Sequence, residues 1–252
     1  MSAMTEQLLT AKDTLSLMSQ TLRRTFQWPW RWPEILKACV SIGIGSLPVI
    51  TIATAFAGMV VTTEMAWHMD QALHTVSMVP GFTGQFIFRE LGIAVPALLL
   101  VAKVGASITA EVGSMKVTEQ IDALKLLRID PVNYLVFPRF IAAVISGACL
   151  TIVASAVTLA FAMLIAITRF NFSVMEYVNA LRHFITYRDL ICAVVKGMIF
   201  GGVIPLISCA YAFRCEGGAE GVGTATTNSV VASTITVITL DFVLTYIFTW
   251  IL

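Results

Sequence analysis

Long apolar segments constrain this chain more than any other feature of its sequence. A helix needs about 20 mostly apolar residues to cross the roughly 30 Å of hydrocarbon in a bilayer. Inside lipid, only helices and closed barrels satisfy all of their backbone hydrogen-bonding groups. We therefore predict an all-α, polytopic membrane protein with about five transmembrane helices. The segments that reach this length cover about residues 38–63, 86–112, 135–168, 188–213 and 226–251.

The composition favours a membrane protein over a soluble one. Of the 252 residues, 58% are hydrophobic and only 12% are charged, whereas soluble domains contain about 45–50% apolar residues. So little polar material cannot cover a soluble fold of this size. The net charge of +1 gives no reason to expect nucleic-acid binding. The five cysteines form no CxxC pair, so we interpret them as small packing residues and expect neither disulfides nor a zinc site.

The sequence before the first span has a different pattern, and we assign residues 1–37 to an N-terminal interfacial amphipathic segment. Leu8, Leu15 and Leu22 recur at seven residues and therefore share one helical face. The sequence Trp28-Pro-Trp-Arg-Trp-Pro33 alternates aromatic rings with a cation, which suits the headgroup layer. Residues 1–27 lack a continuous apolar run and a small-residue cleavage site, so we expect no signal peptide. Since no plastid-type transit peptide is recognisable either, a bacterial inner membrane is favoured over an organelle.

The distribution of Lys and Arg predicts the orientation in the membrane. The segment before the first span and the loop between the second and third spans are both rich in these residues. The positive-inside rule places both on the cytoplasmic side. The loops at 64–84 and 169–187, together with the C-terminus, then lie outside. The basic residues assigned to the cytoplasmic side are Arg23, Arg24, Arg31, Lys37, Lys116, Lys125, Arg128 and Arg139.

A charged, amphipathic island separates the second span from the third. Val117, Ile121 and Leu124 share one helical face, while Gly113-Ser114 and Asp130-Pro131 are suited to begin and end a short helix. We predict a helix over about residues 113–129 that lies on the cytoplasmic surface and docks a partner; a solvated loop helix is the alternative. The charged residues assigned to the docking surface are Glu111, Lys116, Glu119, Asp122, Lys125 and Arg128.

Charged residues inside the apolar segments are functional candidates, because burying a charge in hydrocarbon is costly. Lys196 in the fourth span and Asp241 in the fifth lie at similar depth, and Arg89 and Glu90 enter the second span from the same side. Two interpretations stay open: a charged cluster that lines a cavity toward the outer leaflet, and a structural ion-pair network that joins helices. Lys103, deeper in the second span, is expected to extend toward the cytoplasmic side or toward Glu111.

The sequence contains no recognisable catalytic motif. There is no GxSxG, no HExxH and no GxxxxGK[ST] phosphate loop. His68 and His74 stand six residues apart in a loop, a spacing that we read as surface histidines and not as metal ligands. We therefore predict that the chain is not an enzyme, has no catalytic residue, metal or cofactor, and depends on a separate ATPase if it works as a pump.

Several motifs resemble the permeases of the MlaE/YrbE family, and the resemblance covers about residues 38–250. The most specific motif is Ala110-Glu-Val-Gly-Ser-Met-Lys-Val-Thr-Glu-Gln-Ile-Asp-Ala123. It is accompanied by Arg89-Glu-Leu-Gly92, Val101-Ala-Lys-Val-Gly-Ala-Ser107, Gly217-Gly-Ala-Glu-Gly-Val-Gly223 and Asp241-Phe-Val-Leu244. The resemblance implies that residues 38–252 form the permease domain of an ABC transporter that moves phospholipids between the inner and outer membranes.

The resemblance also implies partners and site residues. The permeases of this family form homodimers and work with a cytoplasmic ABC ATPase, often a STAS-domain protein, and a periplasmic Mce-domain protein. The helix at about 113–129 would be the coupling helix on the ATPase, and the four intramembrane charges would surround the lipid pocket. The chain departs from the family at Lys103, where an arginine is usual, and at Thr224 and Asn228, where arginines are also usual. Apolar residues chosen by segment and depth as pocket candidates are Val95, Leu98, Leu99, Leu240 and Leu244.

Other functions compete with phospholipid transport. A related permease could carry sterols or other hydrophobic molecules with the same machinery. A non-transporting scaffold could anchor the Mce complex, although a scaffold has little need for charges in lipid. An integral-membrane enzyme is disfavoured by the missing catalytic groups.

Overall fold

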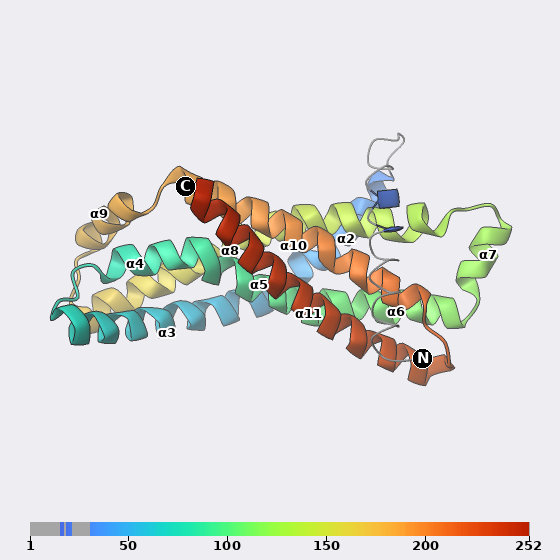
Figure 1. Ribbon diagram of the computed structural model, residues 1–252, viewed down its shortest axis with the longest axis horizontal. Helices are drawn as coiled ribbons and strands as arrows, with labels where there is room; N and C mark the ends of the chain where they lie inside the picture. The colour runs from blue at the N-terminus through green and yellow to red at the C-terminus, as the bar shows by residue number, and fades with distance from the viewer. Residues whose placement is uncertain (1–15, 18, 22–30, 252) are drawn as a thin grey trace. The chain divides into compact units, whose positions relative to one another are not determined.

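The structure is a computed structural model that describes residues 16–17, 19–21 and 31–251. Within these residues every regular element is helical (Figure 1), which confirms the prediction of an all-α polytopic membrane protein. Most of the interfacial segment predicted at 1–37 lies outside the described residues. The five helical stretches long and apolar enough to cross a membrane are Trp32–Ala72, Val79–Val117, Val132–Phe170, Tyr187–Phe213 and Gly218–Trp250.

The first two spans are assembled from shorter helical elements. The first contains α2 (Trp32–Ile42), the 3₁₀ turn η1 (Ile44–Ser46) and α3 (Leu47–Leu73). The second runs through α4 (Val79–Phe86), the π turn η2 (Ile87–Leu91), α5 (Gly92–Leu100), the π turn η3 (Val101–Gly105) and α6 (Ala106–Val117). Arg89 and Glu90 lie in η2 and Lys103 lies in η3. The charges deepest in this span therefore coincide with its π turns, which in helices are frequent at functional positions.

The other three spans are long helices with short elements between them. The short helix α7 (Gln120–Leu126) and the π turn η4 (Val132–Val136) precede α8 (Phe137–Phe170). Helix α9 (Val174–Phe184) follows, and then α10 (Tyr187–Phe213) and α11 (Gly218–Ile251). The described residues group into two compact units, and α8, α10 and α11 each contribute residues to both. Unit 1 contains the described residues up to Ser46 with Leu100–Gly147 and Met198–Thr239, and unit 2 contains Leu47–Leu99, Ala148–Gly197 and the described residues from Leu240 onward.

Unit 1 combines an apolar contact with a buried polar one. Ile35 of α2 packs with Phe137 and Ile141 at the start of α8. Deeper in the unit, the Thr109 hydroxyl of α6 lies 2.9 Å from the Ser229 hydroxyl of α11, and both are buried. This hydroxyl contact satisfies polar groups that lipid could not hydrogen-bond.

In unit 2, helix α9 packs against α4 through small residues. Gly81 and Gly84 of α4 leave room for Phe184 and Leu181 of α9, since a Cβ at either glycine would lie 2.3 Å from the facing side chain. Figure 1 shows the two helices side by side. A capping box begins α9: the Glu176 amide donates to the Ser173 hydroxyl, and the Glu176 carboxylate accepts from the Ser173 amide. That amide donation holds the pKa of Glu176 below its ordinary value.

Gly58 marks the closest approach of α3 to α8 within unit 2. A Cβ at this position would lie 2.2 Å from the carbonyl oxygen of Thr158, so the two backbones would have to separate. We expect Gly58→Ala to lower the free energy of unfolding by about 1–3 kcal/mol, measured as a lower midpoint of thermal unfolding in detergent. Gly223→Ala is the matched control, because a Cβ at Gly223 of α11 has no neighbour within 4 Å and alanine favours helix by about 1 kcal/mol. Equal midpoints for the two variants would contradict this interpretation of the α3–α8 contact.

Candidate functional site

Lys196 of α10 is the centre of a buried charged cluster in unit 2. Its side chain is only 3% exposed. The ammonium group donates to the Asp241 carboxylate at 2.8 Å, to Glu90 at 3.3 Å and to the Thr245 hydroxyl at 2.7 Å. The backbone carbonyl of Arg89 is a fourth acceptor at 3.0 Å, so the three N–H groups of the ammonium are shared among four oxygens. The second, fourth and fifth spans therefore meet at one cation.

The Thr245 hydroxyl also belongs to this cluster, where it contacts the carboxylate of Glu90 and the backbone carbonyl of Asp241. The Thr245 hydroxyl lies 2.7 Å from the Glu90 carboxylate and 2.8 Å from the Asp241 carbonyl oxygen, so it can donate to either. The carboxylates are less buried than the lysine, with side chains 28% exposed for Glu90 and 17% for Asp241. Sequence analysis missed Thr245. Its position four residues after Asp241, on the same helical face, is the signal that could have found it.

Arg89 is adjacent to this cluster but pairs with a different acid. Its Nε donates to the Asp189 carboxylate at 2.8 Å, and the Asp189 side chain is only 1% exposed. The second oxygen of Asp189 accepts from the Thr186 amide at 2.9 Å, which fixes the acid at the start of α10. Arg89 and Glu90 are consecutive in η2 and therefore face different directions, one toward Asp189 and the other toward Lys196. Asp189 is a second residue that the sequence analysis missed, although an acid in the first turn of a helix is a familiar N-terminal signal.

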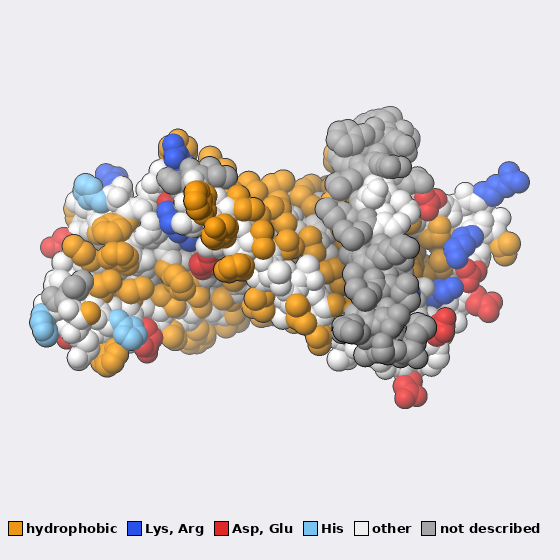
Figure 2. All heavy atoms as spheres, in the orientation of Figure 1, with side chains coloured by type: hydrophobic (Ala, Val, Ile, Leu, Met, Phe, Trp, Pro, Cys, Tyr) orange, Lys and Arg blue, Asp and Glu red, His pale blue; other side chains and the backbone are white. Residues whose placement is uncertain are grey.

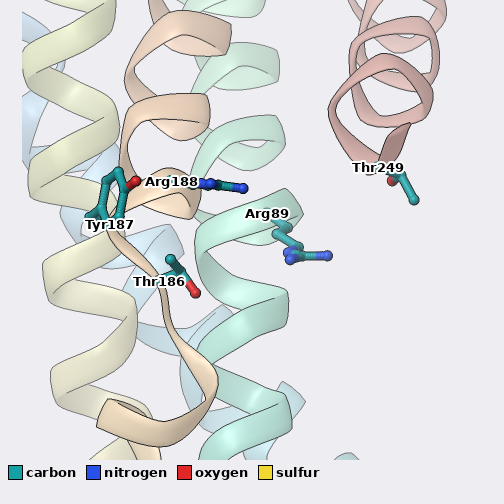
Figure 3. Close-up of a pocket in the computed structure, with 5 residues that line it drawn as sticks. All are labelled: Arg89, Thr186, Tyr187, Arg188 and Thr249. Atoms are coloured by element: carbon teal, nitrogen blue, oxygen red, sulfur yellow. The ribbon is translucent and has the colours of Figure 1, made fainter. Parts of the chain in front are cut away.

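A pocket of about 320 Å³ opens beside the Arg89–Asp189 pair. Figure 3 shows the Arg89 and Arg188 side chains extending in the same direction, toward the side on which Thr249 of α11 lies. The pocket lies entirely in unit 2 and is lined by Arg89, Thr186, Tyr187, Arg188 and Thr249.

The apolar residues proposed for the lipid pocket belong to the same unit. Val95, Leu98 and Leu99 follow η2 on α5, while Leu240 and Leu244 are close to Asp241 in the sequence of α11. All five are half-buried. Their assignment to the pocket stays a prediction.

The charged island has a different helix break from the one expected. Helix α6 continues through Gly113-Ser114 to Val117, and the break falls at Thr118 and Glu119. Gly113 is buried and faces Cys215 and Val222, where a Cβ would make ordinary van der Waals contact at 3.7 Å. The Thr118 hydroxyl donates to the Ser114 carbonyl at 2.8 Å, and Glu119 adopts a left-handed φ of 58°. These local contacts end α6 one turn later than the glycine pattern indicates.

Ion pairs position the charged residues around α7 in unit 1. Asp122 accepts from Lys125 at 2.7 Å and from Lys116 at 3.2 Å. These two hydrogen bonds, that of Lys125 first, hold the pKa of Asp122 below its ordinary value. Glu111 of α6 pairs with Arg139 of α8 at 2.7 Å. These contacts leave Asp122 bridging two lysines, so it supports the shape of α7 as well as its surface charge.

The exposed surface of α7 is partly apolar. Ile121 is buried, whereas Leu126 and Leu127 are 87% and 71% exposed. Glu119 and Arg128, at the two ends of this helix, are exposed and both adopt a left-handed φ of 58°. The sequence analysis assigned charges to this surface and missed the leucine pair, because the sequence alone does not show which face of the helix lacks packing contacts.

Lys103 does not extend toward Glu111, which was one of the two directions expected for it. Its ammonium donates to the backbone carbonyl of Gly45, which lies inside the turn η1. A carbonyl in such a turn is free of the regular helical ladder and can therefore accept this hydrogen bond. The contact joins η3 of the second span to the first span within unit 1.

Comparison with known proteins gives a consistent assignment. The family described as Permease MlaE matches residues 35–247. The chain is 35% identical to a probable ABC transporter permease protein of Rickettsia felis, over 85% of this chain and 82% of that protein. It is 32% identical to a probable ABC transporter permease protein of Synechocystis, over 82% and 78% of the two chains. It is 29% identical to the chloroplastic protein Trigalactosyldiacylglycerol 1 of Arabidopsis thaliana, over 92% and 66%.

These matches cover most of the chain, including the three spans that carry the Lys196 cluster and the island that contains α7. They agree with the multi-pass helical architecture of the structure. The chain belongs to the MlaE permease family.

Proposed function

We propose that this chain is the membrane subunit of an ABC transporter that moves phospholipids between the inner and outer membranes of a bacterium. The observation that carries the proposal is the buried cluster around Lys196, with Glu90 and Asp241, inside spans of a permease-family chain. Ionised groups at such a position are costly and usually mark a substrate pathway. The name of the Arabidopsis relative refers to a glycerolipid, which supports a lipid cargo over a water-soluble one.

A phospholipid matches the distribution of polar and apolar groups in unit 2. The Lys196 cluster and Arg89 supply charge toward one end of the spans. Leu98 and Leu99 of α5 and Leu244 of α11 are half-buried apolar residues of the same unit. An amphiphile would place its polar group near the charges and its acyl chains along the apolar residues. A sterol, with a single hydroxyl, would leave most of these charges without a ligand.

The surface of α7 is the proposed contact for the ATPase. Figure 2 shows Lys, Arg, Asp and Glu side chains gathered around α7. The exposed Leu126 and Leu127 add apolar area between Glu119 and Arg128. A charged rim around an exposed apolar patch is typical of protein interfaces. The basic residues near this island support a position on the cytoplasmic side, where an ATPase has access to ATP.

The remaining partners follow from the family resemblance. The chain would form a homodimer in the inner membrane, with a periplasmic Mce-domain protein on the outer side and, in some systems, a STAS-domain protein on the ATPase. ATP would bind the partner subunit and not this chain. The predicted docking residues Glu111, Lys116, Glu119, Asp122, Lys125 and Arg128 would then transmit its movement to α6 and α8.

Reconstitution of the complex tests the proposed function. The chain would be purified with its ATPase and Mce-domain partners, and ATP-dependent transfer of a fluorescent phospholipid between liposomes would be measured alongside mass spectrometry of co-purified lipid. We expect bound glycerophospholipid and transfer that requires ATP. Recovery of sterols alone would reject the phospholipid cargo, and an assembled complex without ATP-dependent transfer would favour a scaffold.

A further inference from the structure

We propose that Arg139 is a positioning residue that transmits the movement of α7 to the third span through its ion pair with Glu111. This inference rests on the proposed function, in which α7 is the contact for the ATPase, and it assigns Glu111 to a contact inside the permease instead of to the docking surface. The Nη2 of Arg139 donates to the Glu111 carboxylate at 2.7 Å. The pair joins α6 to α8 within unit 1, across 28 residues of sequence that include α7.

The backbone on either side of α7 contains turns, which can absorb a displacement. Glu119 before α7 and Arg128 after it both adopt a left-handed φ of 58°. Rotations of φ and ψ at a few residues of this kind act as hinges, so the backbone alone is a poor route for a push on α7 to reach α8. Figure 1 shows α7 at the end of α6, beyond which the chain returns as α8. A side-chain contact between α6 and α8 supplies a second, direct connection.

Ion pairs form a continuous link from α7 to α8 by way of α6. Asp122 of α7 accepts from Lys116 of α6 at 3.2 Å. Glu111 lies five residues before Lys116 on the same helix and pairs with Arg139 of α8. Over this short distance a helix is stiff along its axis, because its backbone hydrogen bonds join successive turns. A displacement of α7 therefore moves α6 and, through Glu111, the start of α8.

The guanidinium of Arg139 is held in one orientation. Nη1 donates to the backbone carbonyl of Leu135 at 2.8 Å, while Nη2 donates to Glu111. Only 17% of the Arg139 side chain is exposed, compared with 56% of the Glu111 side chain, so the arginine belongs to the packed part of the unit. Two hydrogen bonds fix the direction of a planar guanidinium, which also keeps its charge at all physiological pH values.

The start of α8 packs against two other spans, so a displacement of Arg139 is passed on. Phe137 packs with Ile35 of α2 in the first span. On the side of α10, a Cβ at Gly201 would lie 2.2 Å from the carbonyl oxygen of Ala143, so the two backbones are in close contact. Helices packed without free volume between them transmit strain. The Glu111–Arg139 pair is therefore connected to the first, third and fourth spans within unit 1.

A double-mutant cycle on the full-length chain, assembled with its ATPase and Mce-domain partners, tests the proposal. We expect Arg139→Met and Glu111→Gln each to lower the number of phospholipids transferred per ATP hydrolysed by about tenfold. The combined variant should be no worse than either single one, because the same interaction cannot be lost twice. ATPase co-purification should stay at the wild-type level in all forms. Arg139→Lys should retain part of the coupling, since lysine keeps the charge without the planar fork.

Glu34→Gln is the matched control for Glu111→Gln. Glu34 also pairs with an arginine at 2.7 Å, but its partner Arg31 is only three residues away, at the start of α2. Losing this pair should leave the transfer per ATP unchanged. The midpoint of thermal unfolding in detergent follows the folding of every variant. If Arg139→Met does not assemble, Glu111→Gln makes the same comparison through the more exposed partner of the pair.

Hydrogen exchange gives a readout that does not depend on the cargo. The amides of α7 and those at 132–141 would be compared in the assembled complex with and without ATP and vanadate. In the wild type we expect the nucleotide to change exchange at both places. In Arg139→Met we expect the change at α7 only, because the link to α8 is lost. A variant that is merely less stable would exchange faster with and without nucleotide alike.

Each outcome decides between interpretations. An unchanged transfer per ATP in Arg139→Met, or a wild-type exchange response at 132–141, would overturn the positioning role and leave the permease function untouched. Loss of the ATPase from Glu111→Gln, with Arg139→Met normal, would assign Glu111 to the docking surface and likewise overturn the proposal. If the exchange response depends on Arg139 while the wild-type complex transfers no phospholipid, the positioning role stands and the proposed cargo fails.

Discussion

Replacing Lys196 with methionine is expected to lower the stability of the chain by about 3–5 kcal/mol, because it leaves buried carboxylates without their cation. The side chain of Lys196 is 3% exposed and bonds to both Glu90 and Asp241. Methionine has a similar length, so the change removes charge with little change in volume. The midpoint of thermal unfolding in detergent measures the effect. Lys37→Met is the control, since Lys37 is exposed and a surface change of this kind is usually within about 0.5 kcal/mol.

A neutral triple variant separates the two interpretations of this cluster. Lys196→Met combined with Glu90→Gln and Asp241→Asn removes all three charges together, and replacing a buried ion network in full is often tolerated. We expect the triple variant to recover most of the lost stability and to remain defective in ATP-dependent phospholipid transfer by at least about tenfold. Recovery of both stability and transfer would show that the cluster is a structural ion-pair network only.

Placing glutamates at Leu126 and Leu127 is expected to uncouple the transporter. Both leucines are exposed on α7, so the double variant should fold normally. A charge in the apolar centre of an interface without a partner costs several kcal/mol of binding. Phospholipid transfer should therefore fall at least about tenfold, while lipid binding by the chain remains unchanged. Transfer, ATP hydrolysis and ATPase co-purification would be measured on the reconstituted complex.

Two further variants of exposed residues accompany this experiment, one as a control and one as a charge reversal. Met175→Glu places the same charge on α9, where Met175 is 69% exposed, and should not affect coupling. Glu119→Lys reverses a charge at the α7 surface without touching an ion pair of the described chain. Asp122→Lys is a poorer probe, because Asp122 bonds to Lys116 and Lys125 and its loss would disturb α7 itself. Normal transfer in the leucine double variant would reject α7 as the ATPase contact.

Helix breaks show where sequence patterns were insufficient. Gly113-Ser114 was expected to end the second span, yet the helix continues through it, with Gly113 buried beside Cys215 and Val222. Glycine favours both a break and a close helix contact, and only the neighbour decides between them. The π turns η2 and η3, which position Arg89, Glu90 and Lys103, likewise leave no periodic signal that single-sequence reasoning can recognise.

The sequence by itself determined that the chain crosses the membrane about five times and that charges interrupt the apolar spans. These properties depend on the length and composition of local segments, and the thickness of the bilayer imposes them. Only the tertiary structure decided which charges meet. Lys196 finds Glu90, 106 residues away, and Asp241, 45 residues away, while Arg89 turns to Asp189. Such pairings depend on the rotation and packing of whole helices, and segment composition does not encode these directly.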